Sequence, residues 1–415
     1  MIIGLLVFGS TLGLVAWRPP VLWTNQFDST SLAGSVDSLS ASNDGISVAG
    51  SLLTNGTTDS PFLRDYTPKG DIAWTRTVSN NLQFRFRGVA VGQDGIYAVG
   101  ADSSNTSILK YDFNGNRIWI ENVSTGKWPI TVSTYASNIY LATSSNHPIT
   151  NESFSGLVSF VRKYDANGGI LWTSEYADSS SSLAGTGGIY SAGSGVFVLT
   201  NFGVVAYSLD GVELWSHTLG IPQLVIPTSV SGDPAGVYVS GIAKPSPTSF
   251  ATGFLTKYNF TGSMIWNEKF DSPDGSGAGL EYLSTDSSGI YLSMFSGRTN
   301  GFVLKYGPDG SQLWRFQTPT EPKGAAVNPF LIATASERFY LAGSTQIGQK
   351  AENLVQAFSS LPSLVFFGIN PPISFVLLGV LIGVAVLSIL FLRRTYGSAR
   401  AKRPSSASPD RYKRT

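Results

Sequence analysis

The chain consists of short runs of strand-forming residues separated by clusters of turn residues. In a representative stretch, Ile108–Tyr111 is rich in strand formers, Asp112–Gly115 supplies residues that tolerate turn geometry, and Arg117–Ile120 is again strand-like. This pattern predicts a β-hairpin with a short loop, in which Gly115 supplies the positive φ that such loops commonly need. A β-branched residue at Gly115 is therefore expected to damage the turn.

The hairpin recurs along the chain with its key residues at fixed offsets. In six copies a Tyr lies eight residues, and a Gly four residues, before a Trp. The copies are Tyr66/Gly70/Trp74, Tyr111/Gly115/Trp119, Tyr164/Gly168/Trp172, Tyr207/Gly211/Trp215, Tyr258/Gly262/Trp266 and Tyr306/Gly310/Trp314. Successive Trp residues are 43 to 53 residues apart. This period is typical of β-propeller blades with four strands each.

A second signature precedes each hairpin and occurs seven times, once more than the hairpin. It reads as a short apolar strand that begins at Gly45, Gly95, Asn138, Gly195, Gly236, Gly289 and Arg338. The missing Trp strand lies near the N-terminus, where Leu22–Asp28 resembles Leu171–Ala177. Trp23 precedes Trp74 by 51 residues and so keeps the period.

These repeats predict an all-β fold, a seven-bladed β-propeller over residues 21–358. The strand around Trp23 is expected to pair with Asn353–Phe358 as the outermost strand of the last blade. Such pairing would close the ring and leave no open sheet edge, which would be an aggregation hazard. Each repeat Trp is expected to pack between neighbouring blades.

A family resemblance follows from these repeats. Segments such as Gly301–Gly310 and Lys110–Gly115, each followed by Trp, resemble seven-bladed propeller repeats of bacterial and archaeal surface proteins and those of pyrroloquinoline-quinone-type propellers. The resemblance covers about residues 21–360. It implies one alternative function, a quinoprotein-like dehydrogenase, whose family places a quinone over a Trp with a calcium ion, an Asp base and usually a vicinal disulfide.

The two ends of the chain differ from the repeats. Residues 1–18 are apolar up to Arg18 and predict a signal peptide or a signal anchor. Residues 359–372 form a Pro-containing linker, and residues 373–392 form an uncharged run long enough to cross a bilayer as a helix. Residues 393–415 form a basic tail, which the positive-inside rule places in the cytoplasm, with the propeller outside. A buried core helix and a sorting signal that is removed are the alternatives for the apolar run.

Composition narrows the class of protein further. The chain has no cysteine, which excludes disulfides, thiol catalysis and cysteine-ligated metals. The tail from Arg393 carries eight of the 28 basic residues, so the remainder has 20 basic and 26 acidic residues. A mildly acidic body gives no indication of nucleic-acid binding.

Candidate chemistry is sparse. Five Asn-x-Ser/Thr sequons are candidate glycosylation sites in an exported protein, namely Asn55, Asn105, Asn122, Asn151 and Asn259, and chance in an Asn-rich chain is the alternative. The only histidines, His147 and His217, are interpreted as surface residues. Asp112, Asn114 and Asn116 superficially resemble a calcium loop, as Asp271 and Asp274 do, but turn chemistry accounts for the first set. No residue is nominated as catalytic, cofactor-binding or metal-binding.

One face of the predicted ring carries the less regular loops. The insertions at Ser51–Ser60, Ala101–Thr106, Thr143–Gly156 and Ile242–Gly253 fall on this face, whereas the turns of the opposite face are tight. Near it, Trp128 departs from the Trp register and Phe84-Arg85-Phe86-Arg87 alternates. Core packing is the favoured interpretation of these aromatics, and an aromatic and Arg pair that stacks on sugars or a peptide is the alternative. We therefore expect a non-catalytic, membrane-anchored surface propeller that presents this face to an extracellular protein or glycan.

Overall fold

The computed structural model describes residues 16–27, 35–54, 58–78, 84–102, 105–124, 128–145, 158–176, 188–200, 203–219, 224–244, 246, 250–272, 275, 277–296, 300–318, 326–347, 350–360, 363–365 and 388. The chain divides into two compact units. One comprises Pro20–Leu361, and the other comprises Met1–Pro19 together with Pro362–Thr415.

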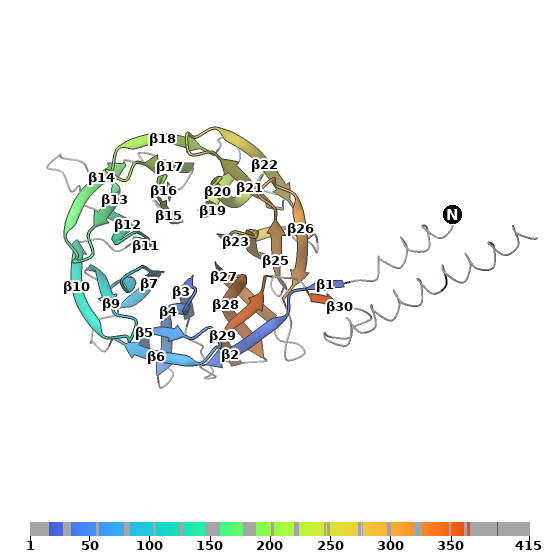
Figure 1. The fold of residues 1–415 in the computed structure, drawn as a ribbon, viewed down its shortest axis with the longest axis horizontal. Helices are drawn as coiled ribbons and strands as arrows, with labels where there is room; N and C mark the ends of the chain where they lie inside the picture. The colour runs from blue at the N-terminus through green and yellow to red at the C-terminus, as the bar shows by residue number, and fades with distance from the viewer. Residues whose placement is uncertain are drawn as a thin grey trace, which may run out of the picture. The chain divides into compact units, whose positions relative to one another are not determined.

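The larger unit is a seven-bladed β-propeller, as the repeats predict (Figure 1). Its first three blades are antiparallel four-stranded sheets with their strands in chain order from the axis outward. Blade 1 comprises β3 (Ser35–Ser42), β4 (Gly45–Thr54), β5 (Thr58–Tyr66) and β6 (Ile72–Thr77). Blade 2 comprises β7 (Arg85–Val91), β8 (Ile96–Ala101), β9 (Thr106–Tyr111) and β10 (Arg117–Ser124). Blade 3 comprises β11 (Trp128–Tyr135), β12 (Asn138–Ser145), β13 (Val158–Tyr164) and β14 (Ile170–Tyr176).

The next three blades repeat this arrangement. Blade 4 comprises β15 (Ile189–Ala192), β16 (Gly195–Leu199), β17 (Gly203–Tyr207) and β18 (Glu213–Thr218). Blade 5 comprises β19 (Leu224–Asp233), β20 (Gly236–Lys244), β21 (Thr252–Tyr258) and β22 (Met264–Phe270). Blade 6 comprises β23 (Ala278–Asp286), β24 (Gly289–Ser296), β25 (Asn300–Tyr306) and β26 (Gln312–Gln317).

Blade 7 joins the two ends of the ring. It comprises β27 (Ala326–Ala335), β28 (Arg338–Ile347), β29 (Lys350–Ser359) and, outermost, β2 (Val21–Phe27) from the N-terminal end. β2 pairs antiparallel with β29, and Trp23 lies opposite Ala357. The predicted closure is thus confirmed. Among the described strands of the propeller, β29 and β2 are the one pair of neighbours in a sheet that no turn connects.

The hydrophobic core is divided among the joints between blades. Each of seven clusters of buried residues in the described part of the chain combines side chains from two neighbouring blades. In one, Tyr97 and Ile108 of blade 2 meet Leu141 and Phe160 of blade 3. Because the apolar strand residues on both sides of each blade are buried in this way, neighbouring blades stabilise one another.

The innermost strands have one edge without a strand partner, a feature that the expectation of a fully closed sheet overlooked. Hydroxyl side chains of the preceding blade supply part of the missing hydrogen bonds. Val89 and Val91 of β7 donate their backbone N–H groups to Ser38 Oγ at 2.9 Å and Ser40 Oγ at 3.0 Å. Leu283 of β23 likewise donates to Ser229 Oγ at 3.0 Å. These bonds satisfy edge groups that would otherwise be available to pair with another chain.

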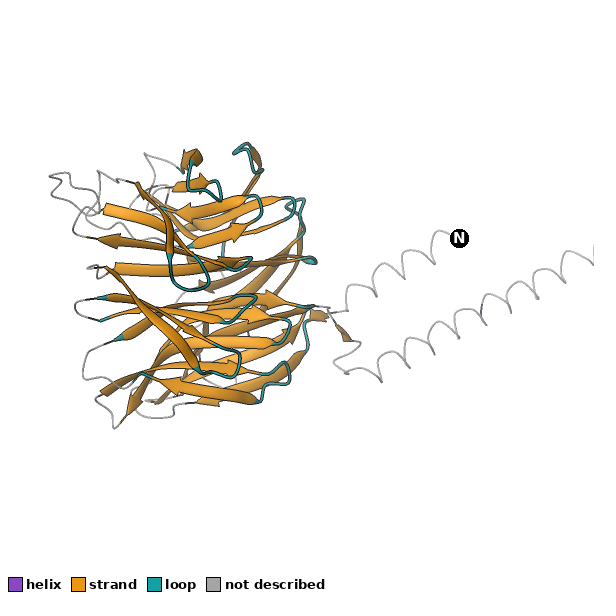
Figure 2. Cartoon of the chain, turned by 60° about the vertical axis from the view of Figure 1, so that its left-hand side comes forward, coloured by secondary structure: helices purple, strands orange, loops and turns teal. Residues whose placement is uncertain are grey.

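The two faces of the ring differ. The turns between first and second strands and between third and fourth strands lie on one face, which we call the tight-turn face, and Figure 2 shows described turns gathered on this side. The opposite face, the irregular face, carries the other connections. The predicted loop Ser51–Ser60 is wrong in part, because β4 and β5 stay paired out to Thr54 and Thr58. Strand extension also shortens the loop after Ile242, since Ala243 pairs with Thr252.

The smaller unit contains one described ladder. β1 (Ala16–Arg18) and β30 (Ser363–Val365) pair antiparallel, with Trp17 opposite Leu364. The predicted leader lies outside the described residues up to residue 15, as does the predicted transmembrane run 373–392 apart from Ser388. Among the described residues, no helix is long and apolar enough to span a membrane.

Candidate functional site

The repeat Trp residues lie at the joints between blades. The indole Nε1 of Trp74 donates a hydrogen bond to Phe113 O of the next blade at 3.0 Å. The same bond to the next third-to-fourth turn is made by Trp23, Trp119, Trp172, Trp215 and Trp266. Trp314 contacts Phe339 of blade 7. In that blade the two ends of the propeller, near Pro20 and Ser359, take the place of the third-to-fourth turn. Each indole is thus a side-chain clamp from one blade to the next.

The repeat Gly residues receive these indoles. Gly70, Gly115, Gly168, Gly211, Gly262 and Gly310 have φ between +78° and +90°, a region that other residues rarely adopt. A Cβ atom added at Gly115 would lie 2.5 Å from Trp74 Cδ2. The turn therefore needs Gly for its backbone conformation and, at Gly115, for contact with the neighbouring indole.

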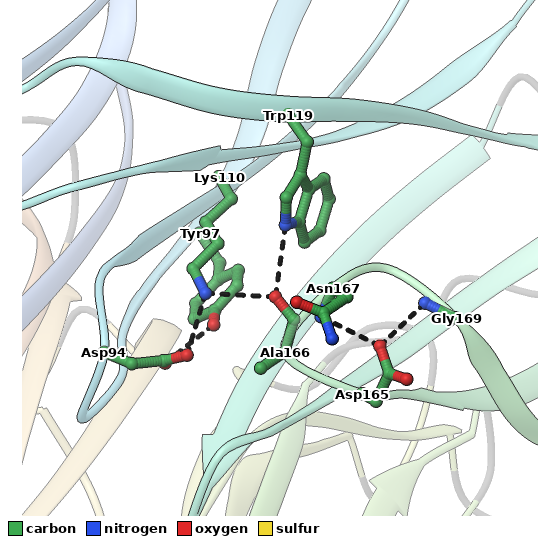
Figure 3. A network of polar contacts seen from close by, with 8 residues as sticks. All are labelled: Asp94, Tyr97, Lys110, Trp119, Asp165, Ala166, Asn167 and Gly169. Carbon is green, nitrogen blue, oxygen red and sulfur yellow. Dashed lines mark hydrogen bonds and ion pairs between the residues drawn. The ribbon is translucent and has the colours of Figure 1, made fainter.

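A polar network supports the clamp between blades 2 and 3 (Figure 3). Lys110 Nζ and Trp119 Nε1 donate to the same acceptor, Ala166 O, at 3.0 and 3.1 Å. Lys110 also forms an ion pair with Asp94 at 2.7 Å, and Tyr97 donates its hydroxyl to the same carboxylate at 2.7 Å. Burial acts to raise the pKa of Asp94, but the hydrogen bonds from Lys110 and Tyr97 hold it below its usual value.

The lysine of this clamp is a recurrent element that the sequence analysis missed. Lys163 donates to Leu209 O at 3.0 Å and Lys257 donates to Pro308 O at 3.1 Å, each sharing its acceptor with the repeat Trp. The sequence contains a signal for it, since Lys110, Lys163, Lys257 and Lys305 directly precede the repeat Tyr. The first three lysines therefore have a structural role in the clamp, whereas Lys305 Nζ donates to Ser288 Oγ at 3.0 Å.

Blade 1 has an acid where other blades have this lysine. Asp65 lies opposite Trp74 on the β5–β6 ladder, as Lys110 lies opposite Trp119 on the β9–β10 ladder. Its carboxylate accepts a hydrogen bond from Ser47 Oγ at 2.7 Å. Burial raises the pKa of Asp65 to about 6, although the Ser47 bond acts in the opposite direction.

Asp65→Asn is expected to stabilise the protein near neutral pH. Because the folded-state pKa is raised, the stabilising contribution of Asp65 is fully present below about pH 4 and is lost as pH rises through about 6. After discounting for solvent screening of a partly exposed group, we expect a gain of about 1 kcal/mol at pH 7.5. Urea unfolding at pH 4 and pH 7.5 would measure it. An advantage of the Asn variant that did not grow with pH would contradict this assignment.

The irregular face has a recurrent feature of its own, a β-bulge in the innermost strand. The ladder between first and second strands shifts register near its irregular-face end in every blade except blade 4. The extra residues include Asp37, Arg87, Thr228 and Phe330. Bulges re-aim side chains and are over-represented beside functional sites. We call this set of positions the bulge ring.

The bulge ring carries mixed chemistry around the propeller axis. In blade 2, Arg85 and Arg87 are exposed, whereas Phe84 and Phe86 between them are buried. In blade 1, Asp37 is close enough to Tyr282 of blade 6 that, after burial, its charge contributes to raising the pKa of this tyrosine. Charged and phenolic groups of three blades thus lie at the irregular-face end of the innermost strands, an arrangement suited to recognising a ligand.

The sequence-based interpretations of the aromatic residues and the histidines differ in how well they agree with the structure. Phe84 and Phe86 are core residues, as favoured, and contact each other at 5.3 Å between ring centroids. The side chain of Trp128 and all of His147 lie outside the described residues. His217 is half-buried, since its ring stacks on Tyr258 and its Nε2 lies 2.6 Å from Gly262 O. The interpretation of His217 as a surface residue was therefore only partly right.

Three sequon asparagines are described. Asn105 and Asn122 are exposed near the irregular face, and Asn122 accepts a hydrogen bond from Ser107 Oγ. Asn259 lies in a turn of the tight-turn face, where its Oδ1 accepts bonds from Thr261 and Ser263. Asn55 and Asn151 lie outside the described residues.

The part of the chain that the structure describes does not fit the quinone and calcium site that the repeat resemblance implies. The chain lacks the cysteines of a vicinal disulfide, and the described residues contain no group of three or more His, Asp or Glu that could hold a metal. Asp112 Oδ1 instead accepts the N–H groups of Asn114 and Asn116 in its own turn. Of the second resemblance to a calcium loop, Asp271 lies among the described residues and Asp274 lies outside them.

Comparisons with solved structures return a β-propeller domain among the matches. The β-propeller domain of the Trilobed protease from Pyrococcus furiosus is 8% identical with a TM-score of 0.51, over 83% of this chain and 99% of that chain. Acylaminoacyl peptidase is 7% identical with a TM-score of 0.51, over 81% and 54%. The Pan2 WD40 domain of Neurospora crassa is 10% identical with a TM-score of 0.49, over 82% and 95%.

Likeness at this level shows the fold alone. The protease domain is described as having an open velcro topology, whereas in this chain β2 joins β29. No protein-family model and no curated protein matches the sequence.

Proposed function

We propose that this protein is a membrane-anchored cell-surface propeller that binds an extracellular protein or glycan through its irregular face. The chain is held by the apolar run 373–392, with the basic tail 393–415 in the cytoplasm and the propeller outside. It spans the membrane once, or twice if the leader is retained. The irregular-face sequons, among them Asn105, suit glycans on an exported protein.

The bulge ring is the observation that carries this proposal. Its backbone feature recurs from blade to blade, but the side chains differ from blade to blade. A purely structural repeat would favour similar residues at equivalent positions, as the clamp Trp residues do. Exposed Arg85 and Arg87 favour a ligand that displays carboxylates, because guanidinium groups bind carboxylates through paired hydrogen bonds.

Arg87→Ala is expected to weaken ligand binding about 10-fold to 100-fold, the usual effect of losing a charge-assisted hydrogen bond. The test uses the immobilised full chain in detergent against arrays of neutral and uronate-containing oligosaccharides and of acidic peptides. Arg117→Ala is the matched control, since it removes an exposed arginine at the tight-turn end of β10. Absence of binding to every acidic probe, or equal losses in both variants, would overturn the proposal.

A further inference from the structure

Exposed apolar and polar side chains occupy different positions along the outermost strands of the propeller. In each outermost strand the residue just before the repeat Trp is apolar and exposed, and we call this set the apolar collar. Its members are Leu22, Ala73, Ile118, Leu171, Leu214, Ile265 and Leu313. The six large side chains are 46 to 55% exposed. They occupy equivalent positions in every blade and so recur at one level around the rim, on the outermost strands of Figure 1.

The wall becomes polar away from this level. Two residues further along each outermost strand, the outward position is polar in six blades, and Ile120 is the exception. Four residues further it is polar in all seven, as in Gln26, Lys269 and Gln317. Strand propensity favours apolar β-branched residues at any outward position, so it does not explain this division. The gradient indicates that the two levels of the wall have different surroundings.

The collar lies at the tight-turn end of the outermost strands. In blades 1 to 6 each collar residue follows the third-to-fourth turn within a few residues, as Ile118 follows Gly115. In blade 7 this turn is replaced by the ends of the propeller itself, where Ser359 N–H donates to Pro20 O at 3.0 Å. The two ends of the propeller therefore lie at the face that the collar encircles.

We propose that the apolar collar rests in the headgroup region of the membrane that anchors the chain, so that the propeller docks on the bilayer by its tight-turn face. This inference rests on the proposed membrane anchoring. Apolar side chains on amphipathic surfaces are buried about 5–10 Å into this boundary. Tethering at the same face raises the effective concentration of the collar at the bilayer, so that a modest intrinsic affinity suffices. The irregular face is then presented away from the membrane.

The charges of the tight-turn face select the kind of lipid. Asp112, Asp165 and Asp309 accept N–H groups of their own turns. The exposed side chains of Asp44, Asp71, Asp210 and Glu337 exceed the exposed bases Lys69 and Arg117 in number. An acidic face is repelled by an anionic surface. The occupant is therefore a bilayer of neutral or zwitterionic lipid, and anionic lipid weakens the docking.

The absence of cysteine makes the proposal directly testable, because any introduced cysteine is the only labelling site. Ile265→Cys places a fluorophore on the collar, and Lys269→Cys places it on the same strand and the same outward side, about 13 Å further along the strand from the tight turn. Ile118→Cys reports from blade 2, on the other side of the ring. The full chain is reconstituted into phosphatidylcholine vesicles that contain a headgroup-labelled quencher lipid.

The proposal predicts at least threefold stronger quenching at residues 265 and 118 than at residue 269. Replacing about a third of the phosphatidylcholine by phosphatidylserine is expected to reduce this difference. Equal quenching at the three positions, quenching on one side of the ring only, or no quenching in vesicles that retain the chain would overturn collar docking. A glycan on Asn259 in the native protein would also overturn it, because Asn259 lies on the docking face.

Failure of the underlying anchoring gives a different result. If the chain does not float with the vesicles in a density gradient, the proposed membrane anchoring is wrong. If it floats but the collar is not quenched, the anchoring stands and only the docking is wrong. The two outcomes are read from the same samples.

Discussion

Trp23→Ala is expected to lower the free energy of unfolding by about 3–5 kcal/mol, the usual cost of removing a large aromatic from a packed site. Its indole stacks on Tyr66 at 5.8 Å between ring centroids and donates to Pro68 O at 3.1 Å. A Cβ at Gly70 would lie 2.6 Å from the ring, which shows how closely the next blade encloses it. Chemical denaturation of the full chain in detergent measures the loss.

The effect of Trp23→Ala should extend beyond the cavity, because Trp23 lies on β2, which no turn connects to its partner strand β29. β2 is held to β29 by ladder hydrogen bonds and side chains, including Gln356 Nε2 to Thr24 Oγ1 at 3.2 Å. Losing the clamp is therefore expected to release β2 and expose the edge of β29. Amide hydrogen exchange of Val21–Phe27 should accelerate well below the denaturation midpoint.

Trp119→Ala is the matched control for this prediction. Trp119 makes the same carbonyl bond, to Ala166 O at 3.1 Å, but its strand β10 is joined to β9 by a covalent turn. We expect a similar loss of global stability without selective release of an outermost strand. Equal protection of the β2 amides in the two variants would show that the joint does not depend on the Trp23 clamp.

Gly115→Ala is expected to cost about 1–2 kcal/mol for its left-handed backbone and a further 1–3 kcal/mol for overpacking. The backbone cost arises because φ is +78°. The overpacking cost arises because the new Cβ would lie 2.5 Å from Trp74 Cδ2, so the indole must move. Urea unfolding of the full chain in detergent is the appropriate measurement.

Gly168→Ala separates these two costs. Its φ of +87° is similar, but the nearest Trp119 atoms would lie 3.7 Å from the new Cβ, an ordinary contact. This variant should therefore lose only about 1–2 kcal/mol, the backbone contribution. Identical losses at Gly115 and Gly168 would contradict a role for Gly115 in accommodating the neighbouring indole.

The candidate site was less predictable than the fold. The sequence contains Arg87 and Asp37, but nothing local marks them as bulged, because a bulge is defined by the register of a strand against its partner. Likewise, the shared acceptor of Lys110 and Trp119 belongs to the next blade, 56 residues from the lysine. The predicted loop Ser51–Ser60 turned out to be mostly paired strand, because the ladder between β4 and β5 continues to Thr54 and Thr58.

The sequence by itself determined the repeat, the number of blades and the partner of the N-terminal strand. It did so because the Tyr, Gly and Trp of each hairpin meet local requirements of strand and turn, which leave a periodic pattern. Only the tertiary structure decided which side chains meet across joints, where the bulges lie and which level of the wall is apolar. These properties depend on contacts between residues about 40 to 60 positions apart, and blade-to-blade packing fixes them.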